Sequence, residues 1–265
     1  MNVYYSFIAG LPDLEFNPEL DFLHSDKFVA MLEELLPPDE MAMVRLLWLQ
    51  KFHGDIAAFL IRKDRTGEIA PGISDDALHS GSDSFGQLPC YLQKLVTWKE
   101  TVRGDWSEMQ IMQKMQQYYF AELISSENLF LKKWGEWELN LLNYRAARRC
   151  ENDSVEKKQQ LIKGNEYHDL LLEFTINQKI IHSEFAAVER LDAIAAKSNY
   201  LEREQETDRL RWETIDEINR FEYFTVNVIL GYFAKLFLLE RWKHILNPKT
   251  PVDAVGIAEQ MMLEK

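Results

Sequence analysis

Cysteine is nearly missing from the 265-residue sequence, which contains only Cys90 and Cys150. Two cysteines cannot form the disulfide framework that holds small secreted proteins together, so a reducing compartment is expected. Glycine and proline are also scarce, at 11 and 8 residues. Few breakers together with abundant Leu, Glu, Lys and Ala favour helices over strands, and we predict an all-α fold.

Positive charge is in short supply, because the formal net charge is −13. An acidic chain without a basic block is a poor binder of nucleic acid and of anionic lipid headgroups. The longest apolar run, 226–239, is too short to span a bilayer and contains Asn227 and Lys235. We therefore expect a soluble, cytoplasmic chain without direct transmembrane insertion, which reaches a membrane only through protein partners.

Motifs for cofactor and metal chemistry are missing as well. Gly81 and Gly86 have the spacing of a phosphate-binding loop, but the required lysine does not follow. His24 and His79 each follow an aspartate by three residues, without the partner glutamates of a di-iron bundle. We expect no catalytic, cofactor-binding or metal-binding residues and no small-molecule substrate.

Two histidines keep an enzyme open as a third hypothesis. His168 lies near Glu166 and Asp169, and His182 lies near Glu184. Helix residues one or two apart point in different directions, so neither cluster converges by itself. A pocket that encloses either histidine with a carboxylate from another helix would support this hypothesis.

Paired aromatic residues can be interpreted either as a binding site for nucleotide bases or as part of a helical core. Trp134 with Trp137 and Tyr118 with Tyr119 could stack nucleotide bases. Since basic flanking residues are missing, packing in a helical core is the favoured interpretation.

Apolar periodicity and helix-breaking residues divide the chain into expected elements. The expected helices cover 21–36, 40–60, 91–149 with breaks near 103–105 and 125–126, 155–198, and 199–242. Residues 64–89 are predicted to be a mobile loop or linker, and 150–154 a polar hinge. Asp105 or Ser107 is expected to cap a helix, and the charges of 202–211 to lie on a solvated helix face.

A loose threefold repeat is the most informative pattern. Each copy has two bulky residues three apart, an Asp or Asn three later, an apolar residue and then a basic one. The copies are Leu49-Phe52-Asp55-Ile56 with Arg62, Trp134-Trp137-Asn140-Leu141 with Arg148, and Phe221-Phe224-Asn227-Val228 with Lys235. On a helix, the bulky residues form one stripe that enters a core, and the polar residue can hydrogen-bond backbone at a neighbouring helix end. Chance similarity among amphipathic helices is the alternative.

Three such units resemble the V-type ATPase subunit called C in bacteria and d in eukaryotes. The opening Tyr4-Tyr5-Ser6-Phe7-Ile8-Ala9-Gly10-Leu11-Pro12-Asp13-Leu14 is similar to the start of a bacterial family of uncharacterised proteins. That family is regarded as a shortened relative of the subunit and is found with V-type ATPase genes. The subunit's pattern tends to place an Asp three residues before the Asn, where this chain has Phe52, Trp137 and Phe224.

The resemblance implies three pseudo-threefold-related helical units that form a funnel, at 1–88, 89–154 and 155–265. It implies a non-catalytic adaptor, peripheral to the inner membrane, whose partners are central-stalk and rotor-ring subunits. The expected repeat-motif residues are Phe52, Asp55, Trp137, Asn140, Phe224 and Asn227, and the expected partner-contacting residues are Arg62, Arg148 and Lys235. An all-helical scaffold or regulatory protein unrelated to rotary ATPases is the second hypothesis.

Overall fold

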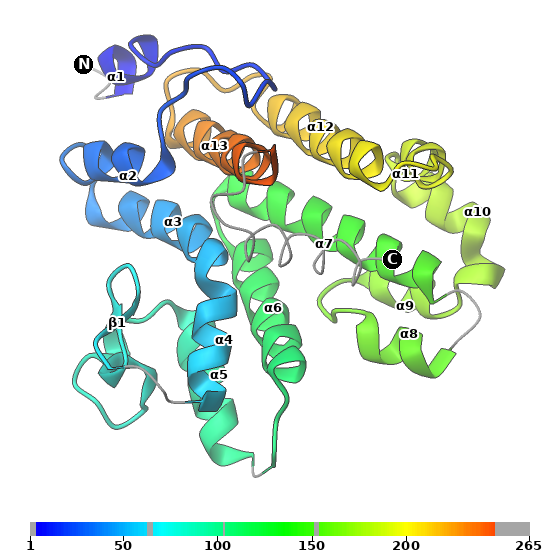
Figure 1. Cartoon of the computed structure of the whole chain (residues 1–265), viewed down its shortest axis with the longest axis horizontal. Helices are drawn as coiled ribbons and strands as arrows, with labels where there is room; N and C mark the ends of the chain where they lie inside the picture. Colours follow the sequence, from blue (N-terminus) through cyan, green and yellow to red (C-terminus); the bar gives the residue numbers. More distant parts are fainter. Residues whose placement is uncertain (1–3, 63–65, 103, 151–153, 247–265) are drawn as a thin grey trace. The chain divides into compact units, whose positions relative to one another are not determined.

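Helices make up nearly all of the secondary structure (Figure 1). The computed structural model describes residues 4–62, 66–102, 104–150 and 154–246. Within these ranges, the only strands are β1 (Glu68–Ala70) and β2 (Ile73–Ser74), which form an antiparallel hairpin. The all-α class predicted from composition is therefore confirmed. None of the helices in these ranges is long and apolar enough to cross a bilayer.

The chain divides into two compact units. Unit 1 combines Met1–Val44 with His182–Lys265, and unit 2 is Arg45–Ile181. The chain passes between the units within α3 (Pro38–Leu49) and again within α10 (Phe174–Glu184). Neither unit corresponds to one of the three segments expected from the resemblance, and that threefold arrangement stays a prediction.

Unit 1 is organised around its last helix. Besides parts of α3 and α10, unit 1 contains α1 (Tyr4–Ala9), α2 (Ser25–Glu33), α11 (Val188–Ala195), α12 (Tyr200–Ile218) and the last helix, α13 (Val226–Leu246). Helix α13 packs along α12 and also contacts α1 and α2 (Figure 1). Phe233, Leu236 and Trp242 are among the buried side chains of this helix.

The single helix predicted for 199–242 is wrong, because the chain turns between α12 and α13. The turn contains no glycine or proline, so the sequence carries no obvious break there. Asn219, the C-cap of α12, donates from Nδ2 to the carbonyl of Asn227 at 2.9 Å. Gly231 permits this approach, because a Cβ there would lie 2.1 Å from Asn219 Nδ2 and 3.2 Å from Ile215.

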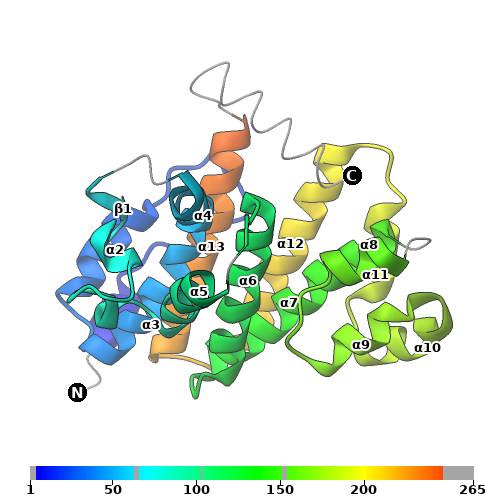
Figure 2. The same ribbon diagram turned by 90° about the horizontal axis from the view of Figure 1, so that it is seen from below.

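Unit 2 has α6 at its centre. Its elements after α3 are η1 (Gln50–Phe52), α4 (His53–Arg62), the hairpin, η2 (Asp76–Leu78), η3 (Phe85–Gln87), α5 (Cys90–Thr101), α6 (Glu108–Ser125), α7 (Leu129–Arg149), α8 (Ser154–Gln160) and α9 (Glu166–Leu172). Helix α6 packs against α4, α5 and α7 (Figure 2). The two breaks predicted within 91–149 are confirmed, and Ser107 forms a capping box with Gln110 at the start of α6.

The described part of the predicted mobile linker, residues 66–89, is part of the unit 2 core. Ile69, Ile73, Leu78 and Leu88 are buried, and the segment contacts α4 and α5. Apolar residues spread thinly through a Gly-, Ser- and Asp-rich stretch hid this packing in the sequence.

Other boundaries also differ from the prediction. The helix predicted for 155–198 is divided into α8, α9, α10 and α11, and η1 separates α3 from α4 within the helix predicted for 40–60. Asn165 explains one break, because its side chain accepts from the backbone of His168 and caps α9. Of the predicted hinge, 151–153 lie outside the described residues.

Candidate functional site

The first copy of the repeat lies where η1 meets α4. Phe52 is the last residue of η1, whereas Asp55 is exposed in the first turn of α4. Arg62 ends α4 and forms an exposed ion pair with Glu108 at 3.4 Å. The motif therefore spans a change of helix type rather than one continuous helix.

The second copy lies on one helix, α7. Trp137 is half-buried and stacks on Trp134, with ring centroids 5.8 Å apart. Asn140 Oδ1 accepts from Asn165 Nδ2 at 2.6 Å, so Asn140 contacts the residue that caps α9. Arg148 is exposed near the end of α7. The motif asparagine therefore reaches a neighbouring helix end in this copy, but through the side chain of the capping residue rather than through the backbone hydrogen bond that the pattern predicts.

The third copy straddles the turn before α13. Phe224 lies in this turn, with its ring centroid 4.4 Å from that of Tyr5. Asn227 is the second residue of α13. Lys235 Nζ lies 2.5 Å from Asp216 Oδ1 and 4.5 Å from the ring centroid of Trp212. The three copies thus have three different local structures.

Two asparagines that the repeat did not single out hold helix connections. Asn143 is fully buried on α7, where its amide donates to the carbonyl of Ile162 and accepts from the Ile162 backbone N–H, both at 2.8 Å. Asn219 likewise donates from its side-chain amide to the carbonyl of Asn227. Each lies within eight residues of a motif asparagine, and only this proximity could have drawn attention to them.

Two buried carboxylates of α12 meet two arginines and an indole in what we call the α12–α13 ion cluster: Glu204, Asp208, Arg211, Arg241 and Trp242. Asp208 is 0% exposed and accepts from Arg211 at 2.7 Å, from Trp242 Nε1 at 2.8 Å and from Arg241. Arg241 also donates to Glu204 at 2.8 Å. Burial acts to lower the pKa of Arg241, but Asp208 and Glu204 outweigh it and raise that pKa.

This cluster corrects the expectation that the charges of 202–211 lie on a solvated face. Glu204 is 1% exposed and Asp208 is 0% exposed, while Glu202 and Arg209 are exposed. A buried carboxylate with several charged donors holds its helices in one register and is costly to break.

A pocket of about 430 Å³, the amino-terminal pocket, also lies in unit 1. Ile8 and residues 11–14 form one side, and α12, α13 and the turn between them form the other, with Asp216, Glu222 and Lys235 in the lining. The hydroxyl of Tyr232 is buried without a hydrogen-bond partner in the described part of the chain. Burial, helped by Asp13, raises the pKa of Tyr232 to about 12, so the hydroxyl stays protonated.

Unit 2 has a neutral polar cluster in its core. His53 lies 3.0 Å from the Tyr91 hydroxyl through Nε2, and its ring meets Tyr119 edge-on at 4.9 Å. Burial lowers the pKa of His53 to about 3, so the imidazole is neutral near pH 7. Glu122 accepts from the Tyr91 backbone N–H and thereby caps α5 from a neighbouring helix.

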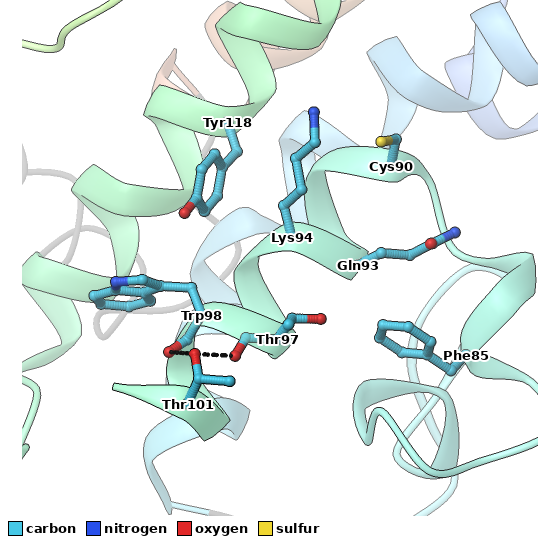
Figure 3. Close-up of a pocket in the computed structure, with 8 residues that line it drawn as sticks. All are labelled: Phe85, Cys90, Gln93, Lys94, Thr97, Trp98, Thr101 and Tyr118. Atoms are coloured by element: carbon cyan, nitrogen blue, oxygen red, sulfur yellow. Dashed lines mark hydrogen bonds between the residues drawn. The ribbon is translucent and has the colours of Figure 1, made fainter. Parts of the chain in front are cut away.

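An open groove of about 460 Å³ lies on the outer face of α5 in unit 2 (Figure 3). Cys90, Lys94, Thr97 and Thr101, at helical spacing, form its floor. We name this floor and the flanking Phe85, Gln93, Trp98 and Tyr118 the aromatic groove. Lys114 adds its ammonium group 4.7 Å from the Tyr118 ring and 5.6 Å from the Trp98 ring. Tyr119 is a core residue, as expected, whereas Tyr118 faces this groove.

The histidines considered for catalysis have local partners. His168 Nδ1 lies 2.8 Å from Asp169 Oδ1, and His182 Nε2 lies 3.6 Å from Asp192 Oδ2 on α11. His182 and Asp192 are both partly exposed, and neither lines the amino-terminal pocket or the aromatic groove. The described residues contain no cluster of three or more potential metal ligands.

A protein-family model matches residues 1–250. The chain belongs to the family described as protein of unknown function DUF2764. No curated protein matches this DUF2764 chain, and no solved structure matches it.

Proposed function

We propose that this DUF2764 protein is a non-catalytic adaptor in a V-type rotary ATPase, linking the central stalk to the membrane rotor ring. The observation that carries the proposal is the opening Tyr4–Leu14. It resembles the start of proteins found with V-type ATPase genes, and in this chain it builds one side of the amino-terminal pocket. Cytoplasmic attachment to the membrane through the ring, and pseudo-threefold units that form a funnel, are part of the proposal.

The physical properties of unit 1 suit an adaptor. A part that transmits torque needs helices that do not slide, and the α12–α13 ion cluster fixes two of them by charged hydrogen bonds. The amino-terminal pocket combines apolar walls with Lys235 and three carboxylates, a mixture of apolar and charged groups typical of surfaces that bind proteins. We propose that this face contacts a rotor subunit through Lys235.

Co-purification from detergent-solubilised membranes tests the proposal. The tagged full-length chain should recover stalk and rotor-ring subunits. Lys235→Gln should weaken recovery without changing thermal unfolding, while Lys133→Gln, at an exposed position of α7, should leave both unchanged. Recovery of the chain without any rotary ATPase subunit contradicts the proposal.

A helical scaffold or regulator unrelated to rotary ATPases is the second candidate. It is favoured by the third copy of the repeat, where Phe221 and Phe224 precede α13 and Phe221 is 83% exposed. A motif that builds equivalent cores should bury its bulky positions in every copy. This candidate predicts recovery with soluble partners and none with rotor-ring subunits.

A further inference from the structure

We propose that the aromatic groove is the docking site for an acidic amphipathic helix of a partner protein. The proposal does not depend on the rotary ATPase assignment, because it rests on unit 2 alone. It commits to one occupant, a helix with an apolar stripe flanked by glutamate or aspartate.

The floor of the groove favours a helix over an irregular peptide. Cys90, Lys94, Thr97 and Thr101 follow one another at intervals of four, three and four residues, so they form one stripe along α5. Three of these side chains are small, which lets another helix approach closely. Helix α5 has 12 residues, or about 18 Å, enough to contact about three turns of a partner.

The walls supply the apolar contact. Trp98 and Tyr118 flank one side of the stripe and Phe85 the other (Figure 3). Trp98 is held from behind by Trp106, with ring centroids 4.7 Å apart, and Trp106 Nε1 donates to the Val102 carbonyl at 3.3 Å. A half-buried, positioned tryptophan is the kind of anchor that dominates helix-in-groove interfaces.

The charge of the groove selects an acidic partner. None of its eight lining residues is acidic, although the chain has 43 Asp and Glu against 30 Lys and Arg. Lys94 is exposed in the floor, and Lys114 lies over the Tyr118 ring at the edge. A basic, aromatic strip on an otherwise acidic protein attracts a negatively charged helix and repels other acidic surfaces.

Contacts in the core hold the backbone beneath the groove in place. The first turn of α5 is capped by Glu122 of α6, and Tyr91, which follows Cys90, is fully buried against His53 and Tyr119. Binding therefore needs little reordering of the groove backbone, which lowers the entropic cost of association.

The test uses the full-length chain and a fluorescein-labelled peptide of about three heptads, with leucine at the first and fourth positions and glutamate beside them. Fluorescence anisotropy should show binding in the micromolar range, about 1–100 µM. A twin peptide with lysine in place of glutamate should bind at least about tenfold more weakly. Equal binding of the two peptides overturns the proposal.

Two variants locate the site. Thr97→Glu places a larger, negatively charged side chain on the exposed groove floor without touching the core, and it should weaken binding of the acidic peptide at least about tenfold. Gln205→Glu, an equivalent change at an exposed position of α12, should leave binding within about twofold. Unchanged thermal unfolding verifies that Thr97→Glu folds, and unchanged binding by that folded variant contradicts the proposal.

The exposed thiol of Cys90 gives an independent readout, since Cys150 is buried. Saturating acidic peptide should slow alkylation of Cys90 by iodoacetamide at least about tenfold, because the peptide covers the floor. Unaltered alkylation places the peptide elsewhere and overturns the proposal. Concentration-dependent self-association, or flotation with phosphatidylglycerol vesicles, that Thr97→Glu abolishes would assign the groove to a second copy or to lipid instead.

Discussion

In unit 1 a buried carboxylate, Asp208, meets two arginines and an indole, whereas in unit 2 a buried histidine, His53, meets two tyrosines. The first arrangement is stable because its charges are matched. The second is stable because its imidazole carries no charge. The two cores should therefore respond to different perturbations, one to loss of a partner and the other to acid.

Loss of one charge from unit 1 should have the largest effect. Asp208→Ala leaves Arg241 and Arg211 without their shared acceptor and should lower the free energy of unfolding by about 3–5 kcal/mol. Asp216→Ala removes a 59% exposed carboxylate from the same helix and should cost less than about 1 kcal/mol. Urea denaturation measures both, and equal costs would show that the cluster is not a stabilising centre.

Acid should act on unit 2 through His53. The unfolded chain takes up a proton near pH 6.5, while the folded state keeps His53 neutral down to about pH 3. Acidification in that window therefore favours the unfolded chain, by up to about 1.4 kcal/mol per pH unit.

The variant His53→Gln isolates this contribution. It should be less stable than the wild type at pH 7, yet lose less stability between pH 6.5 and pH 4. Glu122, whose pKa is raised by burial, titrates in both proteins and cancels in the comparison. Parallel pH profiles for the two proteins contradict a buried neutral histidine.

Substituting a glycine by alanine should change the free energy of unfolding by smaller amounts, and with opposite signs in the two units. Gly231→Ala should cost about 1–3 kcal/mol, because the added methyl meets the Asn219 amide and displaces it from the Asn227 carbonyl. Gly54→Ala, on α4 with open space around it, should instead stabilise by about 0.5–1 kcal/mol. Thermal unfolding of both variants tests whether Gly231→Ala lowers the stability and Gly54→Ala raises it.

The smallest effects concern a type of helix cap that is present in both units. In each case, a glutamate from another helix accepts a hydrogen bond from the first turn of the capped helix. Glu240 accepts from the backbone and hydroxyl of Ser25 at 2.6 and 2.8 Å and caps α2, as Glu122 caps α5. Glu240→Ala and Glu122→Ala should each cost about 1 kcal/mol. Hydrogen exchange at the first turns of α2 and α5 should increase only in the matching variant, and a change in both helices would contradict separate caps.

Local signals in the sequence predicted much of unit 2, and non-local contacts explain what was missed. Ser107 and the serines near 125 mark the ends of α6 because capping is a local property. The turn at Asn219 and the burial of Glu204 depend on α13, which lies further along the chain. No pattern in 202–211 distinguishes the buried carboxylates from the exposed ones until Arg241 is placed beside them.

The candidate sites were less predictable than the fold. Lys235 was singled out by the repeat, and it does line the amino-terminal pocket, but its partners Asp216 and Trp212 come from another helix. The aromatic groove joins η3, α5 and α6, so only folding brings Phe85 to the stripe on α5. Tyr118 and Tyr119 are adjacent in sequence, but Tyr118 lines the groove and Tyr119 is buried in the core. An aromatic pair in a sequence does not show which of its two residues is buried.

The most direct measurement is the subunit composition of a V-type ATPase purified from its native membrane through a tag on a catalytic subunit. If this DUF2764 protein is the adaptor between stalk and ring, mass spectrometry should detect it in the intact complex and lose it when the ring dissociates. An intact, ATP-hydrolysing complex that contains both stalk and ring but never this chain would contradict the adaptor account.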